Sequence, residues 1–205
     1  FTSILKIKKI KPDIIFNALH GKNGEDGKIQ SFFEYFKIPY THSGVIPSML
    51  AMNKHVSKQL FIQNKIKTPK YFLIDEKSKS NINLLKKTTS NNIKFPVVIK
   101  PNDEGSSIGV KICNNLRFLK KEFSILKKKY KSLIVETYIP GQEIQVALMS
   151  GKAIGAIELR PKRKFYDYKA KYKKSSKTIH LMPADIPKIK YKEVLRISEE
   201  ANKVL

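Results

Sequence analysis

The chain has 205 residues, enough for one or two domains with a buried core. Hydrophobic residues make up 41% of it and charged residues 28%, with 9 glycines and 10 prolines, which excludes collagen-like, low-complexity and mostly disordered proteins. The formal net charge of +24 would suit binding to a nucleic acid or an anionic membrane. However, 37 of the 41 basic residues are lysine, whereas arginine forms the better paired hydrogen bonds to phosphates and base edges. We therefore interpret the lysines as a solvated surface.

The first elements predict an α/β unit. The apolar run at residues 13–19 (DIIFNAL) predicts a short buried strand that leads into a polar, glycine-rich loop at residues 20–27. Apolar residues at three- and four-residue steps over residues 29–36 then predict an amphipathic helix, and residues 38–40 resemble the next short strand. In such units, ligands gather beyond the strand ends.

The rest of the chain is predicted to alternate helices with strands at first and then to hold strands that pair directly. Helices are expected over residues 53–64 and 118–130, and strands over residues 71–74, 95–100, 110–113 and 133–136. Residues 143–149 and 153–159 predict a hairpin, because Ser150-Gly151 between them suits a two-residue turn. Apolar residues spaced along one face from Tyr191 to Leu205 predict a final helix.

The cysteine content predicts the cellular compartment, and the chain ends predict whether the sequence is part of a longer protein. Cys113 is the single cysteine, which rules out an internal disulfide and a multi-cysteine metal site and fits a reducing compartment. No apolar run approaches the roughly 18 residues of a membrane span, so we expect a cytoplasmic protein. The chain opens with Phe1 rather than Met and its last helix lacks a closing signal. We therefore expect an internal piece of a longer protein.

The segment KPNDEGSSIG, residues 100–109, is a candidate phosphate-binding loop. Its glycines let backbone N–H groups approach an anion, its hydroxyls add donors, and Lys100 supplies a positive charge at the preceding strand end. It is not a Walker loop, since Val110 rather than lysine follows Gly109 and a strand rather than a helix comes next. An ordinary hairpin with a small-residue turn would explain the segment equally well.

Two further segments have a nucleotide-binding interpretation beside a structural one. In ETYIPGQE, residues 136–143, extended backbone could bind an adenine edge and a carboxylate further on could bind ribose hydroxyls; two strands joined by a Pro-Gly turn need no ligand. In FYDYKAKY, residues 165–172, alternating aromatic and basic residues could stack on single-stranded bases or form a lid over a triphosphate. The alternative for this segment is a solvated loop.

Histidine and nucleophile patterns are weak. His20 ends the first predicted strand at the glycine loop, where a donor could meet a substrate carboxylate, although a structural role fits as well. The other histidines have no companion at metal-ligand spacing. Neither Cys113 nor any serine stands in a nucleophile motif such as G-x-S-x-G, so covalent catalysis is disfavoured.

Six segments, in order and at compatible spacing, carry a family resemblance: FNALHGKNGEDGKIQ, IPYTHSGV, AMNK, FPVVIKPNDEGSSIGV, VETYIPGQE and FYDYKAKY. Together they resemble the D-alanine-D-alanine ligases of the ATP-grasp superfamily over nearly the whole chain. The resemblance implies an α/β and α+β fold of the ATP-grasp type. Residues 1–47 would be the C-terminal part of an N-terminal α/β substrate domain (the pre-ATP-grasp domain), residues 48–135 the central ATP-grasp subdomain, and residues 136–205 the start of an incomplete C-terminal half.

The resemblance also implies site residues, each carried over by its motif position. In the implied catalytic set, Ser106 and Tyr172 orient the closed lid and the substrate, and Lys171 reaches the γ-phosphate. His20 would lie near the carboxylate of the first D-alanine. The implied ATP-binding set comprises Lys54, Lys100, Ser107 and Lys171 for the phosphates, Glu136, Thr137 and Ile139 for adenine, Glu143 for ribose, and Tyr166 in the lid.

The implied reaction joins two D-alanines for peptidoglycan precursor synthesis. One carboxylate attacks the γ-phosphoryl of ATP to give an acyl phosphate, and the amine of the second D-alanine then displaces phosphate. Partners would be ATP and D-alanine, with Mg²⁺ or Mn²⁺ in the complete protein, which would be a homodimer without nucleic-acid or membrane partners. The metal ligands are expected beyond Leu205, so the 205-residue piece alone is expected to be inactive.

Two alternatives remain open at this point. Another ATP-grasp carboxylate-amine ligase, with a different acceptor, would share the phosphate and adenine segments. A basic nucleic-acid-binding module would explain the charge of +24 and the aromatic-basic segment.

Overall fold

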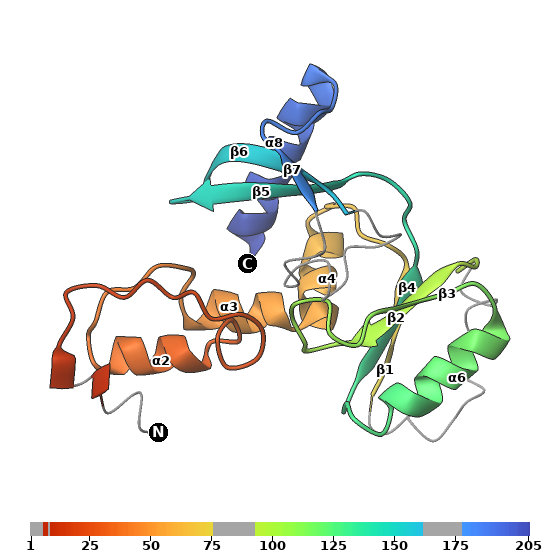
Figure 1. Cartoon of the computed structure of the whole chain (residues 1–205), viewed down its shortest axis with the longest axis horizontal. Helices are drawn as coiled ribbons and strands as arrows, with labels where there is room; N and C mark the ends of the chain where they lie inside the picture. Colours follow the sequence, from red (N-terminus) through yellow and green to blue (C-terminus); the bar gives the residue numbers. More distant parts are fainter. Residues whose placement is uncertain (1–5, 8, 76–92, 162–177) are drawn as a thin grey trace.

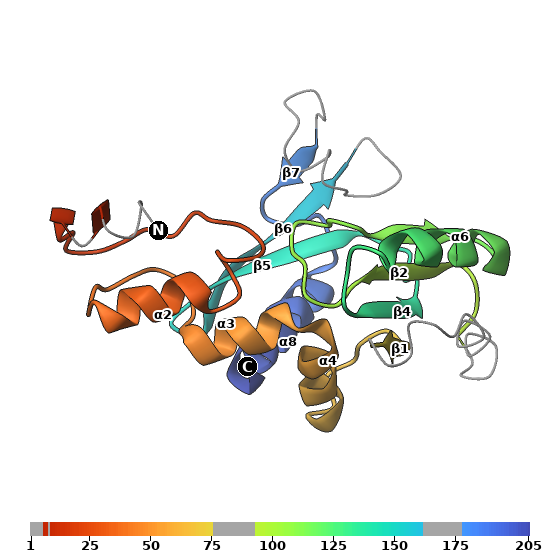
Figure 2. The ribbon, with the colours of Figure 1, turned by 90° about the horizontal axis from the view of Figure 1, so that it is seen from below.

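The structure, a computed structural model, describes residues 6–7, 9–75, 93–161 and 178–205. Figure 1 shows an N-terminal part with helices α2 (Lys28–Tyr35) and α3 (Val45–Met52), a four-stranded sheet beside helix α6 (Leu116–Leu126), and a three-stranded sheet with helix α8 (Lys188–Val204). Helix α4 (Lys54–Gln63) stands between α8 and the four-stranded sheet, as the view from below in Figure 2 also shows.

The N-terminal part confirms the predicted helix but corrects the strand before it. Ile15 pairs with Tyr40 in a single parallel bridge. The two predicted strands on either side of α2 are therefore reduced to this one bridge. The prediction of a buried strand over residues 13–19 is wrong, because Ile14 and Phe16 are 63% and 78% exposed. The segment has one pairing partner among the described residues, and the buried side chain there is that of Asn17, whose Nδ2 donates to the Gly24 carbonyl at 3.0 Å.

The four-stranded sheet contains the strands predicted from the apolar runs. They are β1 (Tyr71–Ile74), β2 (Val97–Pro101), β3 (Lys111–Cys113) and β4 (Leu133–Thr137), all antiparallel, in the order β1-β4-β2-β3. The predicted basic helix is α6, which begins where the side chain of Asn115 accepts a hydrogen bond from the Phe118 N–H at 2.9 Å.

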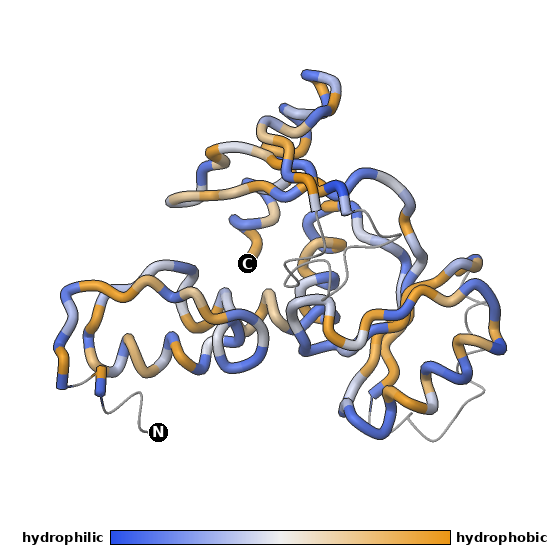
Figure 3. The backbone as a smooth tube through the Cα atoms, in the orientation of Figure 1, coloured by the Kyte–Doolittle hydropathy of each residue, from blue (hydrophilic) through white to orange (hydrophobic). Residues whose placement is uncertain are grey.

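The two faces of this sheet carry different sets of side chains, because successive side chains in a strand point to opposite sides. One face packs against α6 and forms the apolar core, with the fully buried residues Val97, Ile99, Leu133, Val135, Leu119 and Phe123. The other face carries the intervening residues Val98, Lys100, Ile134 and Glu136. Figure 3 shows how strongly apolar the strands are, with polar residues at their ends.

The three-stranded sheet confirms the predicted hairpin. Strands β5 (Glu143–Met149) and β6 (Lys152–Arg160) are joined at Ser150 and Gly151, both with positive φ, as a tight hairpin turn requires. Strand β7 (Ile179–Leu181) pairs with β6 and was not predicted. The predicted C-terminal helix is α8, which is tied to β6 where the Tyr191 hydroxyl accepts from the Ala156 N–H at 3.1 Å.

The division into residues 1–47, 48–135 and 136–205 remains a prediction. Its first boundary falls within α3 and its second within β4. A continuous helix and a continuous strand therefore cross the positions where the motifs were expected to change domain.

Candidate functional site

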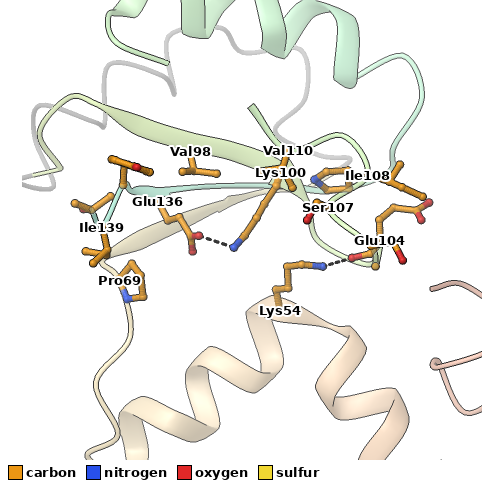
Figure 4. Close-up of a pocket in the computed structure, with 15 residues that line it drawn as sticks. Lys54, Pro69, Val98, Lys100, Glu104, Ser107, Ile108, Val110, Glu136 and Ile139 are labelled. Carbon is orange, nitrogen blue, oxygen red and sulfur yellow. Dashed lines mark hydrogen bonds and ion pairs between the residues drawn. The ribbon is translucent and has the colours of Figure 1, made fainter. Parts of the chain in front are cut away.

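A cavity of about 390 Å³ lies on the face of the four-stranded sheet that carries Lys100 and Glu136 (Figure 4). Its walls come from β2 and β4, the loop between β2 and β3, the segment after β4, and the first residue of α4. Seven of the predicted site residues line it: Lys54, Lys100, Ser106, Ser107, Glu136, Thr137 and Ile139. The structure therefore brings together residues that lie up to 85 positions apart in the sequence.

Lys100 and Glu136 form an ion pair on one side of the cavity. Lys100 stands opposite Ile134 and Glu136 opposite Val98, so the two are diagonal neighbours on the same face of the sheet. Lys100 Nζ donates to Glu136 Oε1, and both side chains are largely buried, with exposed fractions of 19% and 9%. Figure 4 shows the two side chains pointing toward each other.

Lys58 holds the second oxygen of the same carboxylate. Its Nζ lies 2.8 Å from Glu136 Oε2, an ion pair without the alignment of a hydrogen bond. The same Nζ donates to Thr68 Oγ1 at 2.7 Å and to the Pro69 carbonyl at 3.2 Å. Burial lowers the pKa of Lys58, and the charge of Glu136 partly offsets that shift. Glu136 is thus held between two lysines.

Lys54 faces this pair from the start of α4. Its Nζ donates to the carbonyls of Glu104 and, at 3.3 Å, of Asn102, which holds the ammonium beside the β2–β3 loop. Burial, followed by the positive charge of Lys100, lowers the pKa of Lys54 to about 8. Two lysines that meet at one cavity form a site suited to a polyanion.

Asn102 fixes the β2–β3 loop to α4. Its Oδ1 accepts from the His55 N–H at 2.8 Å, its Nδ2 donates to Asn53 Oδ1 at 3.0 Å, and its carbonyl accepts from the Lys54 N–H at 3.1 Å. The first backbone donors of α4 are therefore used within the protein. An anion in the cavity would be bound by the Lys54 side chain rather than by the helix terminus.

The predicted phosphate loop has the conformation that its composition suggests. Ser106, Ser107 and Gly109 all have positive φ, at 51°, 57° and 73°, and a Cβ at Gly109 would lie 2.8 Å from Pro101 Cγ. Two consecutive serines in the left-handed region are uncommon, and such strain is concentrated at functional sites. The loop curls over the cavity and turns the chain from β2 into β3.

The N-terminal glycine loop touches this phosphate loop. A Cβ on Gly105 would lie 2.8 Å from Gly21 Cα and 3.2 Å from Glu25 Oε2, so only glycine permits this approach. Glu25 Oε2 accepts from the Gly21 N–H, and His20 Nδ1 lies 3.9 Å from Glu25 Oε1. His20 is therefore placed near the mouth of the site, although it is not among the residues that line the cavity.

The segment after β4 supplies the opposite wall. The N–H groups of Thr137 and Tyr138 donate to the carbonyls of Lys70 and Pro96, at 3.0 and 3.2 Å. These two donors are therefore used within the protein and are not available to a ligand in the cavity.

Of the other predicted site residues, His20 and one more are described and do not line the cavity, and three lie outside the described residues. Glu143, the first residue of β5, is not among the lining residues. Tyr166, Lys171 and Tyr172 lie outside the described residues.

The sequence missed two residues that organise the site. Lys58 stands four residues after Lys54, so the helical repeat puts both on one face of α4, but this spacing does not reveal a buried partner. Asn102 follows Lys100-Pro101, and its amide makes contacts that depend on the position of α4.

Neither a metal site nor a membrane helix is found in the described residues. No group of three or more His, Cys, Asp or Glu side chains is placed to hold a metal ion there. None of the helices described is long and apolar enough to cross a bilayer. The buried Cys113 has a pKa raised by burial to about 12, which makes its thiol unreactive.

Comparison with known proteins decides the family. A family model described as D-ala D-ala ligase C-terminus matches residues 60–205, and one described as D-ala D-ala ligase N-terminus matches residues 3–43. The chain belongs to the D-alanine-D-alanine ligase family. This confirms the resemblance read from the six segments.

Relatives of this ligase family match over most of the chain. A D-alanine-D-alanine ligase of Pelagibacter ubique is 52% identical over 199 residues, which cover 97% of this chain and 64% of the relative. One from Wolbachia pipientis wMel is 47% identical over 195 residues, covering 93% of this chain and 58% of the relative. The chain thus spans less than two thirds of the length of these ligases.

Solved structures of the ligase family confirm the expected ATP-grasp fold. The VanG D-Ala:D-Ser ligase of Enterococcus faecalis matches with a TM-score of 0.79 and 28% identity, covering 94% of this chain and 56% of that one. The D-alanine-D-alanine ligase of Bacillus anthracis complexed with ATP matches with a TM-score of 0.78 and 28% identity, covering all of this chain (100%) and 63% of that one.

Proposed function

We propose that this chain supplies the nucleotide-binding part of an ATP-dependent ligase that joins two D-alanines for peptidoglycan precursors. The observation that carries the proposal is the convergence of Lys54, Lys100 and Glu136, from three elements, on one cavity under a glycine-serine loop. Membership in the ligase family and the ATP complex of a structural relative support the choice of nucleotide.

The proposed reaction has two steps. A carboxylate oxygen of the first D-alanine attacks the γ-phosphorus of ATP, and ADP leaves with the electrons of the broken bond. The amine of the second D-alanine then attacks the acyl carbon, loses a proton, and displaces inorganic phosphate. Positive charge from Lys54 and Lys100 would offset the charge of the bound triphosphate, since positioning and electrostatic stabilisation dominate phosphoryl transfer.

Roles for the remaining predicted residues are part of the proposal. Ser106 and Ser107 would donate to phosphate oxygens, Thr137 and Ile139 would border the base, and Glu143 would take the ribose. His20 would lie beside the first D-alanine carboxylate. Tyr166, Lys171 and Tyr172, outside the described residues, would act in the lid, with Lys171 at the γ-phosphate.

The described residues do not fit a Mg²⁺ or Mn²⁺ site by themselves, because they hold no cluster of three candidate ligands. We predict that the whole protein binds Mg²⁺ through ligands outside this chain and forms a homodimer. Inactivity of the 205-residue piece and the three-part domain division also remain predictions. A cytoplasmic location is proposed from the single cysteine.

The test is an assay of phosphate release by the full-length protein. We expect ATP turnover that depends on D-alanine and yields a D-alanine dipeptide. The panel should include L-alanine, D-serine and glycine, because one structural relative is a D-Ala:D-Ser ligase. Turnover that prefers another amine acceptor would favour the alternative of a different carboxylate-amine ligase, and turnover without D-alanine would contradict the proposal.

The salt dependence of oligonucleotide binding distinguishes the ligase from the alternative of a nucleic-acid-binding module. A basic module would bind oligonucleotides with an affinity that falls steeply as salt increases, and Tyr172→Ala would weaken that binding by about 1–3 kcal/mol. We expect no specific oligonucleotide binding, measured by fluorescence anisotropy at two salt concentrations.

A further inference from the structure

Lys58 lies behind the cavity and is held by contacts to several segments. It is 6% exposed, and its ammonium contacts Glu136 on β4 and the Thr68 and Pro69 oxygens before β1. It also lies over the Tyr71 ring, 4.9 Å from the ring centroid. Lys58 is not among the residues that line the cavity, so a ligand there would not meet it directly.

Glu136 divides its two oxygens between two lysines in different positions. Oε1 is bound by Lys100, which lines the cavity, and Oε2 faces Lys58, which does not. A polyphosphate that enters the cavity offers Lys100 a stronger partner, because phosphate carries more charge than one carboxylate. Because Lys58 itself does not line the cavity, this exchange leaves its contact with Oε2 in place.

Exchange of Lys100 from Glu136 to a phosphate would leave Oε1 as an acceptor facing the cavity. A buried carboxylate that loses its only cation is strongly disfavoured, but here Lys58 remains at Oε2. An ionised carboxylate only accepts hydrogen bonds. It therefore suits an exocyclic amino group, such as that of adenine, and disfavours the carbonyl oxygen at the same position of guanine.

We propose that Lys58 is a positioning residue for the nucleotide base: it keeps the Glu136 carboxylate charged and oriented when Lys100 turns to the phosphates. This inference rests on the proposed ATP-dependent function. It assigns to Lys58 a role in choosing the base, through Glu136, and assigns to Lys54 and Lys100 the recognition of phosphate.

The experiment compares three ligands on the full-length protein: ATP, GTP and inorganic tripolyphosphate. For Lys58→Met, calorimetry should show ATP affinity lowered by about tenfold or more, a smaller ATP-to-GTP preference, and tripolyphosphate affinity changed less than about twofold. The control is Lys121→Met, which removes the charge of an exposed lysine on α6. It should leave all three affinities unchanged.

Two further variants keep the test decisive if Lys58→Met folds poorly. Thr68→Val removes the hydroxyl that accepts from Lys58 without touching Glu136, and should weaken ATP binding in the same sense but by less. In the double variant Lys58→Met/Glu136→Gln no buried carboxylate is left unpaired. Relative to Glu136→Gln alone, it should change ATP affinity by less than about twofold.

The possible failures are distinct. If the wild-type protein binds no ATP, the proposed function fails and this inference fails with it. If the wild type binds ATP and Lys58→Met binds it equally well, the inference alone is overturned. Equal losses for ATP and tripolyphosphate would also overturn it, because they would show a general effect on charge or folding.

Discussion

Lys100 and Glu136 contact each other diagonally across strands β2 and β4, on the side of the sheet away from α6. Their neighbours Ile99 and Val135 point the other way into the apolar core. The ion pair is thus attached to a well-packed support, and a ligand in the cavity must exchange with contacts that these side chains make with each other.

Glu136→Gln should destabilise the protein strongly. The substitution keeps the shape of the side chain but leaves the buried ammonium of Lys58 without its counter-charge. Removing one partner of a buried ion pair costs about 3–5 kcal/mol, so we expect a loss of about 3 kcal/mol in urea-unfolding experiments. Glu193→Gln, on α8, is the matched control: its carboxylate forms an exposed ion pair with Lys190, and because exposed ion pairs contribute little to stability, its unfolding curve should stay close to that of the wild type.

ATP binding should weaken as pH rises above 8, through Lys54. Its pKa is lowered to about 8, so the ammonium is present below that pH and lost above it, while bound phosphate favours the charged form. Affinity should fall by about tenfold per pH unit above 8 until the pKa of the complex is reached. Calorimetry in buffers of different ionisation enthalpy should also show proton uptake on binding near pH 8.

Lys54→Met supplies the control for this pH dependence. The variant should bind ATP more weakly at pH 7 and lose the decline between pH 8 and 9.5. A decline that persists unchanged in the variant would assign the titration to another group.

Gly105→Ala should separate the two glycine loops. The new Cβ would lie 2.8 Å from Gly21 Cα, and overpacking of this kind costs about 1–3 kcal/mol. Because Asn102 fixes the β2–β3 loop to α4, we expect the loop that carries His20 to be displaced, and KM for D-alanine to rise more than KM for ATP in steady-state kinetics of the full-length protein. Gly155→Ala, whose Cβ would meet its nearest atom at 3.9 Å, should change neither value; a similar effect of both variants would contradict the loop-contact explanation.

Arg160→Met should destabilise the protein more at pH 7 than at pH 4. Arg160 makes two hydrogen bonds to Glu158, at 2.6 and 2.9 Å, and lowers the pKa of that carboxyl. A depressed carboxyl pKa stabilises the fold above the unfolded-state value and loses this effect as pH falls through the folded-state value. Thermal melts at both pH values test this, with Arg196→Met as the control, since Arg196 pairs with Glu200 on the exposed side of α8. An equal shift at the two pH values would exclude the carboxyl of Glu158 as the cause.

Sequence patterns predicted the regular elements well where periodicity and turn chemistry agree. The β5–β6 hairpin was predicted because Ser-Gly between two β-rich runs is typical of a two-residue turn. In the structure, Ser150 and Gly151 have the positive φ values that such a turn needs. The buried strand over residues 13–19 was wrong, since an apolar run shows a preference for burial without showing whether a neighbour covers it. Strand β7 was missed because three residues of mixed polarity carry no usable period.

The cavity was predicted in its members but not in its geometry. Lys54, Lys100 and Glu136 could be named from their motifs, and all three line the same space. Their mutual contacts depend on strand register and on the place of α4, which no local pattern contains. Lys58 and Asn102 escaped notice for this reason, because each acts through partners ten or more residues away.

The alternation of faces along β2 also limits how this gene segment can vary. Deleting or inserting one codon within β2 would swap Ile99 with Lys100 in the pleat, so that an ammonium would enter the apolar core under α6 while an isoleucine would face the cavity. Both the apolar core and the cavity therefore constrain the length of this strand. Natural length variation should be confined to the connections on either side of it.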